Sequence, residues 1–278
     1  MPAAADGKLA VVATTTIVAD VVRQIGGQNI QIATLLPVGA DSHSFEPSPQ
    51  DMALVSKAGL VFANGAGLET FLNQLIENAG AKGRVIDVSQ GLALLSGSGD
   101  AAGGNDPHVW TDPNNVMVWV ENIRAALSQA DPQHADAYQT NADQYTAQLK
   151  SLDAWIRDQV TAIPEANRKI VTDHLVFGYF ANRYGLDQVG AIVSGYSTLA
   201  SPSAQALANI ENEIQKYGVK AIFVGNSVNP NMAQRVADDT HVKLVYLYTE
   251  SLSKSDGPAA NYLDYMRFDV GEIVAALR

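Results

Sequence analysis

Residues 131–164, with the sequence DPQHADAYQTNADQYTAQLKSLDAWIRDQVTAIP, decide the fold of this chain. The segment opens with Asp131-Pro132, a capping residue followed by proline, and it closes at Pro164. In between, apolar residues recur at steps of three and four, at Ala135, Tyr138, Ala142, Tyr145, Leu149, Leu152, Ile156, Val160 and Ile163. This spacing predicts one helix of roughly 30 residues, about 45 Å long at 1.5 Å per residue. The length of such a helix exceeds the extent of one domain layer. We therefore expect it to pack along two lobes of a globular protein and not to form a coiled-coil arm.

Short apolar runs alternate with amphipathic stretches on both sides of this segment. The runs that predict strands are 9–14, 30–36, 60–64, 84–88, 169–172, 189–193, 221–224 and 243–247. The stretches that predict helices are 17–26, 49–58, 68–79, a helix after Asp112-Pro113, one ending at Tyr184, 202–218, one after Pro230 and one from Ala259. This alternation predicts parallel sheets with helices on both faces. We therefore expect an α/β protein with an N-terminal lobe (1–130), a linking helix (131–164) and a C-terminal lobe (165–278), each lobe with its own core.

Composition excludes several classes of protein. The net charge of −11 argues against nucleic-acid binding, which requires a basic surface. No run approaches the ~18 apolar residues of a membrane span. The absence of cysteine excludes disulfides, thiolate metal sites and a lipid-modified N-terminal cysteine in this chain. Residues 1–5 have neither a charged nor an apolar signal region, so the chain is either cytoplasmic or a secreted protein in its mature form.

Three of the five histidines lie where a strand is expected to give way to a helix. They are His43, His108 and His174, and junction loops of this kind carry binding chemistry in α/β folds. Neutral imidazole is the commonest metal ligand among side chains. The pattern predicts one buried metal ion held by distant parts of the chain. His134, near the start of the long helix, and His241, before a strand, are expected to be surface residues.

Several motifs are spread along nearly the whole chain. They are Ala13-Thr14-Thr15-Thr16, His43-Ser44-Phe45-Glu46-Pro47-Ser48-Pro49, Asp106-Pro107-His108-Val109-Trp110-Thr111-Asp112-Pro113, His174-Leu175-Val176-Phe177-Gly178-Tyr179-Phe180, Pro202-Ser203-Ala204-Gln205, Leu252-Ser253, Gly257-Pro258 and Tyr262. In sequence and order these motifs resemble the metal-binding solute receptors of ABC transporters, the cluster A-I family that captures zinc or manganese outside bacterial cells.

The resemblance implies two parallel-sheet lobes joined by one long backbone helix, with metal in the cleft between them. By motif, it assigns His43, His108 and His174 as three ligands. The fourth family position is usually Asp, and this chain has Glu250 there, one methylene longer. Such a carboxylate could bind through both oxygens or leave room for a water. Asp256, in the same loop, is the alternative fourth ligand.

Three imidazoles and one carboxylate form a four-coordinate set that suits Zn²⁺. Manganese prefers more oxygen, and its receptors in this family typically carry a carboxylate where this chain has His174, so Mn²⁺ is the alternative cargo. Glu46, Asp106 and Asp112 flank the ligands and are candidates for holding the imidazole rings, although Asp112 is expected above all to cap a helix. The Gly-rich loop 96–105 lies where many zinc receptors insert histidines, and it contains none.

The resemblance further implies an extracytoplasmic receptor, expected to be monomeric, that delivers its ion to an ABC permease. A zinc-dependent hydrolase is the competing class, because sites of three histidines and a carboxylate also occur in enzymes. Catalytic zinc keeps an open position for water, and four protein ligands would close it. A rigid helical connector also predicts that the lobes move little on metal loading.

Overall fold

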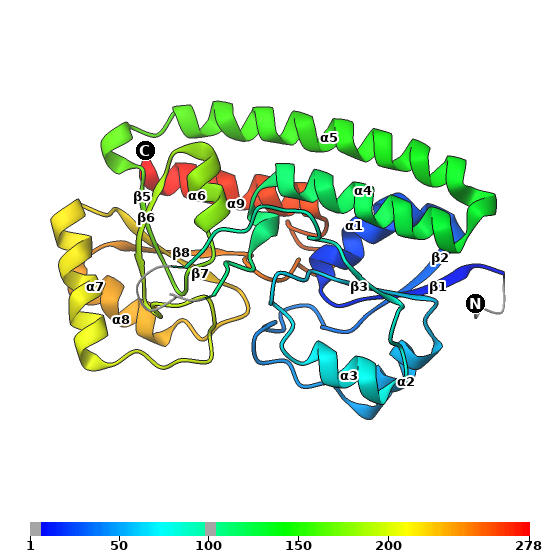
Figure 1. The fold of residues 1–278 in the computed structure, drawn as a ribbon. Helices are drawn as coiled ribbons and strands as arrows, with labels where there is room; N and C mark the ends of the chain where they lie inside the picture. The colour runs from blue at the N-terminus through cyan, green and yellow to red at the C-terminus, as the bar shows by residue number, and fades with distance from the viewer. Residues whose placement is uncertain (1–6, 98–103) are drawn as a thin grey trace.

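Two four-stranded parallel sheets, one in each half of the chain, lie below a single long helix (Figure 1). The computed structural model describes residues 7–97 and 104–278. The first sheet has the strand order β2-β1-β3-β4. Its strands and the helices around it are β1 (Leu9–Ala13), α1 (Thr16–Gly26), β2 (Ile30–Thr34), α2 (Pro49–Lys57), β3 (Leu60–Ala63), α3 (Leu72–Asn78), β4 (Val85–Asp87) and α4 (Pro113–Ala130).

The second sheet repeats this arrangement with the order β6-β5-β7-β8. Its elements are β5 (Lys169–Thr172), α6 (Gly178–Tyr184), β6 (Asp187–Ala191), α7 (Ala204–Tyr217), β7 (Ala221–Gly225), α8 (Asn231–Thr240), β8 (Lys243–Leu247) and α9 (Tyr262–Leu277). All pairings in both sheets are parallel. The central strand β7 is buried along its whole length, as a parallel strand covered on both faces must be. The predicted α/β class is confirmed.

The long helix α5 (Ala135–Thr161) has 27 residues and is therefore about 40 Å long. It begins after a 3₁₀ turn at Pro132–His134 and packs on α1, α4 and α9, so it runs along both halves of the molecule (Figure 1). Its buried residues reproduce the stripe predicted from the sequence: Tyr138, Ala142, Tyr145, Leu149, Leu152, Ile156 and Val160. The helix packs on the globule and does not form a coiled-coil arm.

The expectation of one separate core per lobe is wrong. A single apolar cluster contains residues of β1, α1 and α4 together with residues of α6, β7 and α9. The reason is that α5 and α9 carry apolar faces that contact both halves. At the junction, the backbone N–H of Tyr262 donates to Asp20 Oδ2 of α1 at 2.9 Å. A smaller cluster around α7 and α8 forms the outer core of the second half.

Some element boundaries also differ from the predictions. Helix α3 begins at Leu72 and not at residue 68, because the Glu69 carboxylate accepts hydrogen bonds from the N–H groups of Asn64 and Gly65 and holds this stretch as a loop. Helix α7 begins at Ala204, after its cap Ser203, two residues later than the predicted start at residue 202. Part of the predicted 96–105 loop lies outside the described residues. Among the described helices, none is long and apolar enough to cross a membrane.

Candidate metal centre

Four side chains from separate parts of the chain meet between the two sheets. His43 follows β2, His108 precedes the 3₁₀ turn that leads into α4, His174 follows β5 and Glu250 follows β8. Each lies just beyond the carboxyl end of a strand or before a helix, where loops of α/β folds gather ligands. All four are buried, with exposed fractions of 8%, 0%, 0% and 3%, respectively. The structure thus brings together the four residues expected from the sequence.

The donor atoms converge on one point. Nε2 of His108 lies 3.2 Å from Nε2 of His43 and 3.2 Å from Nε2 of His174. Glu250 Oε1 lies 3.2 Å from His43 Nε2, 3.0 Å from His174 Nε2 and 4.0 Å from His108 Nε2. A tetrahedral ion with bonds of about 2.0–2.1 Å requires donors roughly 3.3 Å apart, so the spacing fits a metal ion at the centre.

Carboxylates orient two of the imidazole rings. Asp106 Oδ1 lies 2.8 Å from His108 Nδ1, and Asp173 Oδ1 lies 2.6 Å from His174 Nδ1. A proton on Nδ1 directed at a carboxylate leaves the lone pair of Nε2 facing the centre. This contact places Asp106 in the expected role. Asp173 was not singled out in the sequence, although its position next to His174 is the signal that could have found it.

Asp112 and Glu46, the other two flanking carboxylates, do not contact the rings. Asp112 caps α4 through the N–H of Asn114, as predicted, and its second oxygen accepts from Arg183 Nε at 2.7 Å. Glu46 is exposed. His134 and His241 lie outside the cluster, as expected: His134 pairs with Asp131, and His241 is exposed at the end of α8.

Glu250 presents a single oxygen to the imidazoles. Its other oxygen, Oε2, accepts hydrogen bonds from the backbone N–H of Ser42 at 3.0 Å and from Ser42 Oγ at 2.7 Å. Oε1 has no hydrogen-bond donor apart from the facing histidine nitrogens. The extra methylene of Glu relative to Asp is therefore accommodated by anchoring one oxygen to the turn that carries His43. Asp256, the alternative from the sequence, is exposed and lies outside the cluster.

The loop that carries Glu250 is fixed to both halves of the molecule. The carbonyl of Thr249 accepts from Trp110 Nε1 of the first half at 2.9 Å and from Tyr265 Oη of α9 at 3.0 Å. On the other side of Glu250, Ser251 Oγ accepts a hydrogen bond from the N–H of Gly39 at 2.8 Å. Because these bonds hold both sides of Glu250, the carboxylate is placed before any ion arrives.

Burial and the carboxylates set the protonation of the site. Burial lowers the pKa of His108 below its usual value, outweighing the neighbouring Asp106 carboxylate. Burial also disfavours imidazolium at His174, but the Asp173 and Glu250 carboxylates together raise its pKa to about 10. Although burial opposes its ionisation, the pKa of Glu250 lies well below its usual value because His174 and His43 hydrogen-bond to the carboxylate. The protonated form of His174 is thus stabilised by two carboxylates, Asp173 and Glu250.

Comparison with known proteins agrees with this geometry. The family model described as the periplasmic component A of the zinc-uptake complex (ZnuA) matches residues 11–276. The manganese-binding lipoprotein MntA of Halalkalibacterium halodurans is 34% identical over 98% of this chain and 90% of its own length.

Two solved structures have the same fold. One is the periplasmic zinc-binding protein TroA from Treponema pallidum, with a TM-score of 0.91, 26% identity and coverage of 98% of this chain and 99% of its own. The other is the Mn-bound periplasmic metal-binding protein from Candidatus Liberibacter asiaticus, with a TM-score of 0.85, 27% identity and coverage of 98% and 100%.

Proposed function

Because this chain belongs to the family of periplasmic metal-binding components of ABC uptake systems, we propose that His43, His108, His174 and Glu250 bind the divalent ion that the protein delivers to its permease. One observation carries this assignment. Three imidazole nitrogens and one carboxylate oxygen, all within 4.8 Å of one another, share a buried position between the two sheets. Among the described residues, the ion pairs of the buried Glu250 carboxylate are with these imidazoles and not with a lysine or arginine, and a cation at their centre would account for the burial of its charge.

Family membership makes the protein a receptor of a transport system and not an enzyme, and it confirms the expected extracytoplasmic location. The competing hydrolase would need Glu250 as a base directed at water on an open metal position. Glu250 instead points Oε1 at the imidazole nitrogens and commits Oε2 to Ser42. The carboxylate therefore acts as a fourth donor, and the resulting set is closed.

For the cargo, the donor set favours Zn²⁺. One carboxylate oxygen with three imidazoles gives four donors at tetrahedral spacing, which is the usual environment of zinc in proteins. Mn²⁺ is the second candidate, because the relative from Halalkalibacterium halodurans is named a manganese-binding lipoprotein. Manganese would need additional oxygen ligands, which Glu250 could supply only by releasing Ser42.

The test combines affinity with a count of ligands. Calorimetric titration of the purified protein with Zn²⁺ and with Mn²⁺ gives stoichiometry and affinity, and X-ray absorption at the metal edge gives the coordination number and the nitrogen-to-oxygen ratio. We expect one ion per chain, tighter binding of Zn²⁺, and three nitrogens with one oxygen. Binding of neither ion would refute the proposal. Tighter binding of Mn²⁺ with five or six ligands would make manganese the cargo.

A further inference from the structure

We propose that a cavity in the second half of the molecule is the passage by which the ion reaches His174, and that a hydrogen bond between Thr198 and Asp41 closes its inner end. The inference rests on the proposed function. The four ligands are buried, and none is more than 8% exposed. A site closed to this degree cannot exchange its ion with water unless part of its wall moves.

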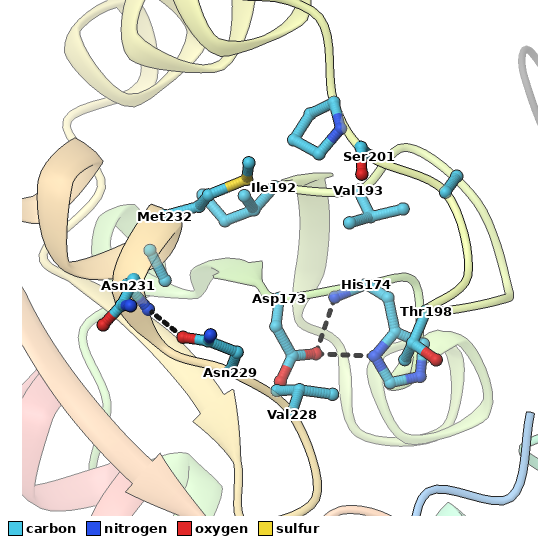
Figure 2. Close-up of a pocket in the computed structure, with 13 residues that line it drawn as sticks. Asp173, His174, Ile192, Val193, Thr198, Ser201, Val228, Asn229, Asn231 and Met232 are labelled. Atoms are coloured by element: carbon cyan, nitrogen blue, oxygen red, sulfur yellow. Dashed lines mark hydrogen bonds and ion pairs between the residues drawn. The ribbon is translucent and has the colours of Figure 1, made fainter. Parts of the chain in front are cut away.

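The cavity has a volume of about 410 Å³ and ends at the metal centre, since Asp173 and His174 form part of its wall. In Figure 2, Asn231 and Met232 lie on the opposite side of the cavity from His174 and Thr198. The wall comes from the residues that follow β5, β6 and β7, at the carboxyl ends of the strands, where parallel sheets admit ligands.

The lining suits a hydrated cation. It contains no lysine or arginine, and among its apolar side chains it carries neutral oxygens from Thr198, Ser201, Asn229 and Asn231. The Asp173 carboxylate, hydrogen-bonded to His174 and to the N–H of Gly225, lies at the inner end. Neutral oxygens of this kind can replace water around a divalent ion one ligand at a time without holding it. A single carboxylate at the inner end attracts the ion toward His174.

The wall between this cavity and the first half of the molecule is loosely held. No residue from 193 to 203 is buried, and the large side chain of Leu199 is 67% exposed. Within the described chain, the one hydrogen bond that residues 196–202 make to another segment is Thr198 Oγ1 to Asp41 Oδ2, at 2.6 Å. The same segment also contacts the metal centre through Tyr196, whose ring centroid lies 6.2 Å from that of His108. Segments with little buried apolar surface open locally at low free energy, so this bond and the ring contact are what keep the wall shut.

Asp41 also belongs to the turn that carries a ligand. Its Oδ1 accepts the backbone N–H of His43 at 2.9 Å, while Oδ2 accepts from Thr198. The Asp41 carboxylate thus holds both the turn that carries His43 and the segment 196–202. When the bond to Thr198 breaks, the segment can move away from His174 and open the cavity to the ion.

Binding and release of Zn²⁺ by the intact chain test the gate. Stopped-flow fluorescence follows both rates, because Trp110 lies 5.3 Å from the His108 ring, with release triggered by excess EDTA. Thr198→Val removes the hydroxyl and should raise both rate constants about tenfold, whereas Thr198→Ser keeps it and should match the parent. Unchanged rates, or faster release with unchanged association, would overturn the gate, since the latter means that the bond only positions His43.

A second experiment tests the passage and exploits the absence of cysteine. In Ala200→Cys, at the cavity wall, a bulky maleimide attached after folding should slow both rates at least fivefold relative to the unlabelled variant. The matched control is Thr140→Cys, exposed on α5, where the label should have no effect. Equal rates before and after labelling of Ala200→Cys would show that the ion takes another path. If the parent chain bound no Zn²⁺ in calorimetry, the proposed function itself would fail.

Discussion

At the scale of single residues, the site depends on how each donor is held. Asp106 and Asp173 hold two of the imidazoles, and the turn at Ser42 holds Glu250. The carboxylate supplies the only full negative charge among the four donors. A divalent ion in a buried site needs such compensation, because the penalty for an unpaired buried charge amounts to several kcal/mol.

We therefore expect Glu250→Ala to weaken Zn²⁺ binding by at least tenfold and to admit water to the ion. Glu250→Asp retains the negative charge and should lose much less Zn²⁺ affinity than Glu250→Ala. The shorter side chain can still reach the ion if it gives up the hydrogen bonds with Ser42. Isothermal titration of the three proteins with Zn²⁺ measures the difference. Unchanged affinity in Glu250→Ala would remove Glu250 from the ligand set.

Removal of one imidazole tests the assignment by motif. His108 is fully buried at the centre of the cluster, whereas His134 pairs with Asp131 at the start of the long helix. His108→Ala should weaken Zn²⁺ binding at least tenfold, since each ligand supplies part of a total of roughly 10–16 kcal/mol in structural sites. His134→Ala should leave it unchanged. Equal losses in the two variants would contradict the placement of the site.

Acid should compete with metal at His174. Its pKa of about 10 means that the metal-free protein carries a proton there at neutral pH, and the ion must displace that proton. Affinity for Zn²⁺ should accordingly rise about tenfold per pH unit across neutral pH, with release of about one proton from His174 per ion. Calorimetry in buffers of different ionisation enthalpy counts the protons. No proton release at pH 7 would mean that His174 is already neutral in the metal-free protein.

At the scale of secondary-structure elements, the sequence predicted most of what positions the site. The alternation of strands and helices, the stripe of the long helix and the cap at Asp112 are local signals, and the structure has all three. The predictions failed where a distant partner decides. Glu69 holds residues 64–70 out of helix, and its carboxylate accepts a hydrogen bond from Thr14 Oγ1, 55 positions away, at 2.6 Å. The Ser42 hydrogen bonds to Glu250 join turns 208 positions apart, which no local pattern reveals.

Asp112 stabilises the start of α4 through two contacts. Asp112 accepts the N–H of Asn114 at the start of α4 and pairs with Arg183 of α6. Asp112→Asn keeps the cap but loses the ion pair, and should cost less than 1 kcal/mol of unfolding free energy because Arg183 is partly exposed. Asp112→Ala loses both and should cost about 1–2 kcal/mol. Urea unfolding of the metal-free proteins measures the difference, and identical losses would mean that the cap contributes nothing.

At the scale of the whole molecule, the two sheets are not independent units. The alternating pattern predicts a set of strands and helices for each half, but it cannot show that α5 and α9 contribute their apolar residues to one shared cluster. That shared core limits hinge motion around the long helix, while the outer cluster of α7 and α8 is separate from it. The first half has a separate outer cluster too, around α2 and α3. Motion on ion exchange is expected in the segment 196–202 because none of its residues is buried.

The shared core predicts cooperative unfolding. Leu149, on α5, is fully buried within the cluster that spans both halves, so Leu149→Ala should cost about 2–5 kcal/mol. Because that cluster contains residues of both sheets, the loss should shift one transition without splitting it. Leu54→Ala, at a position 41% exposed, is the matched control and should change little. Urea unfolding followed by both tryptophan fluorescence and far-UV circular dichroism gives the answer. Coincident curves are expected for the parent and for Leu149→Ala, whereas two separated transitions in the parent would mean that the halves fold independently despite their common core.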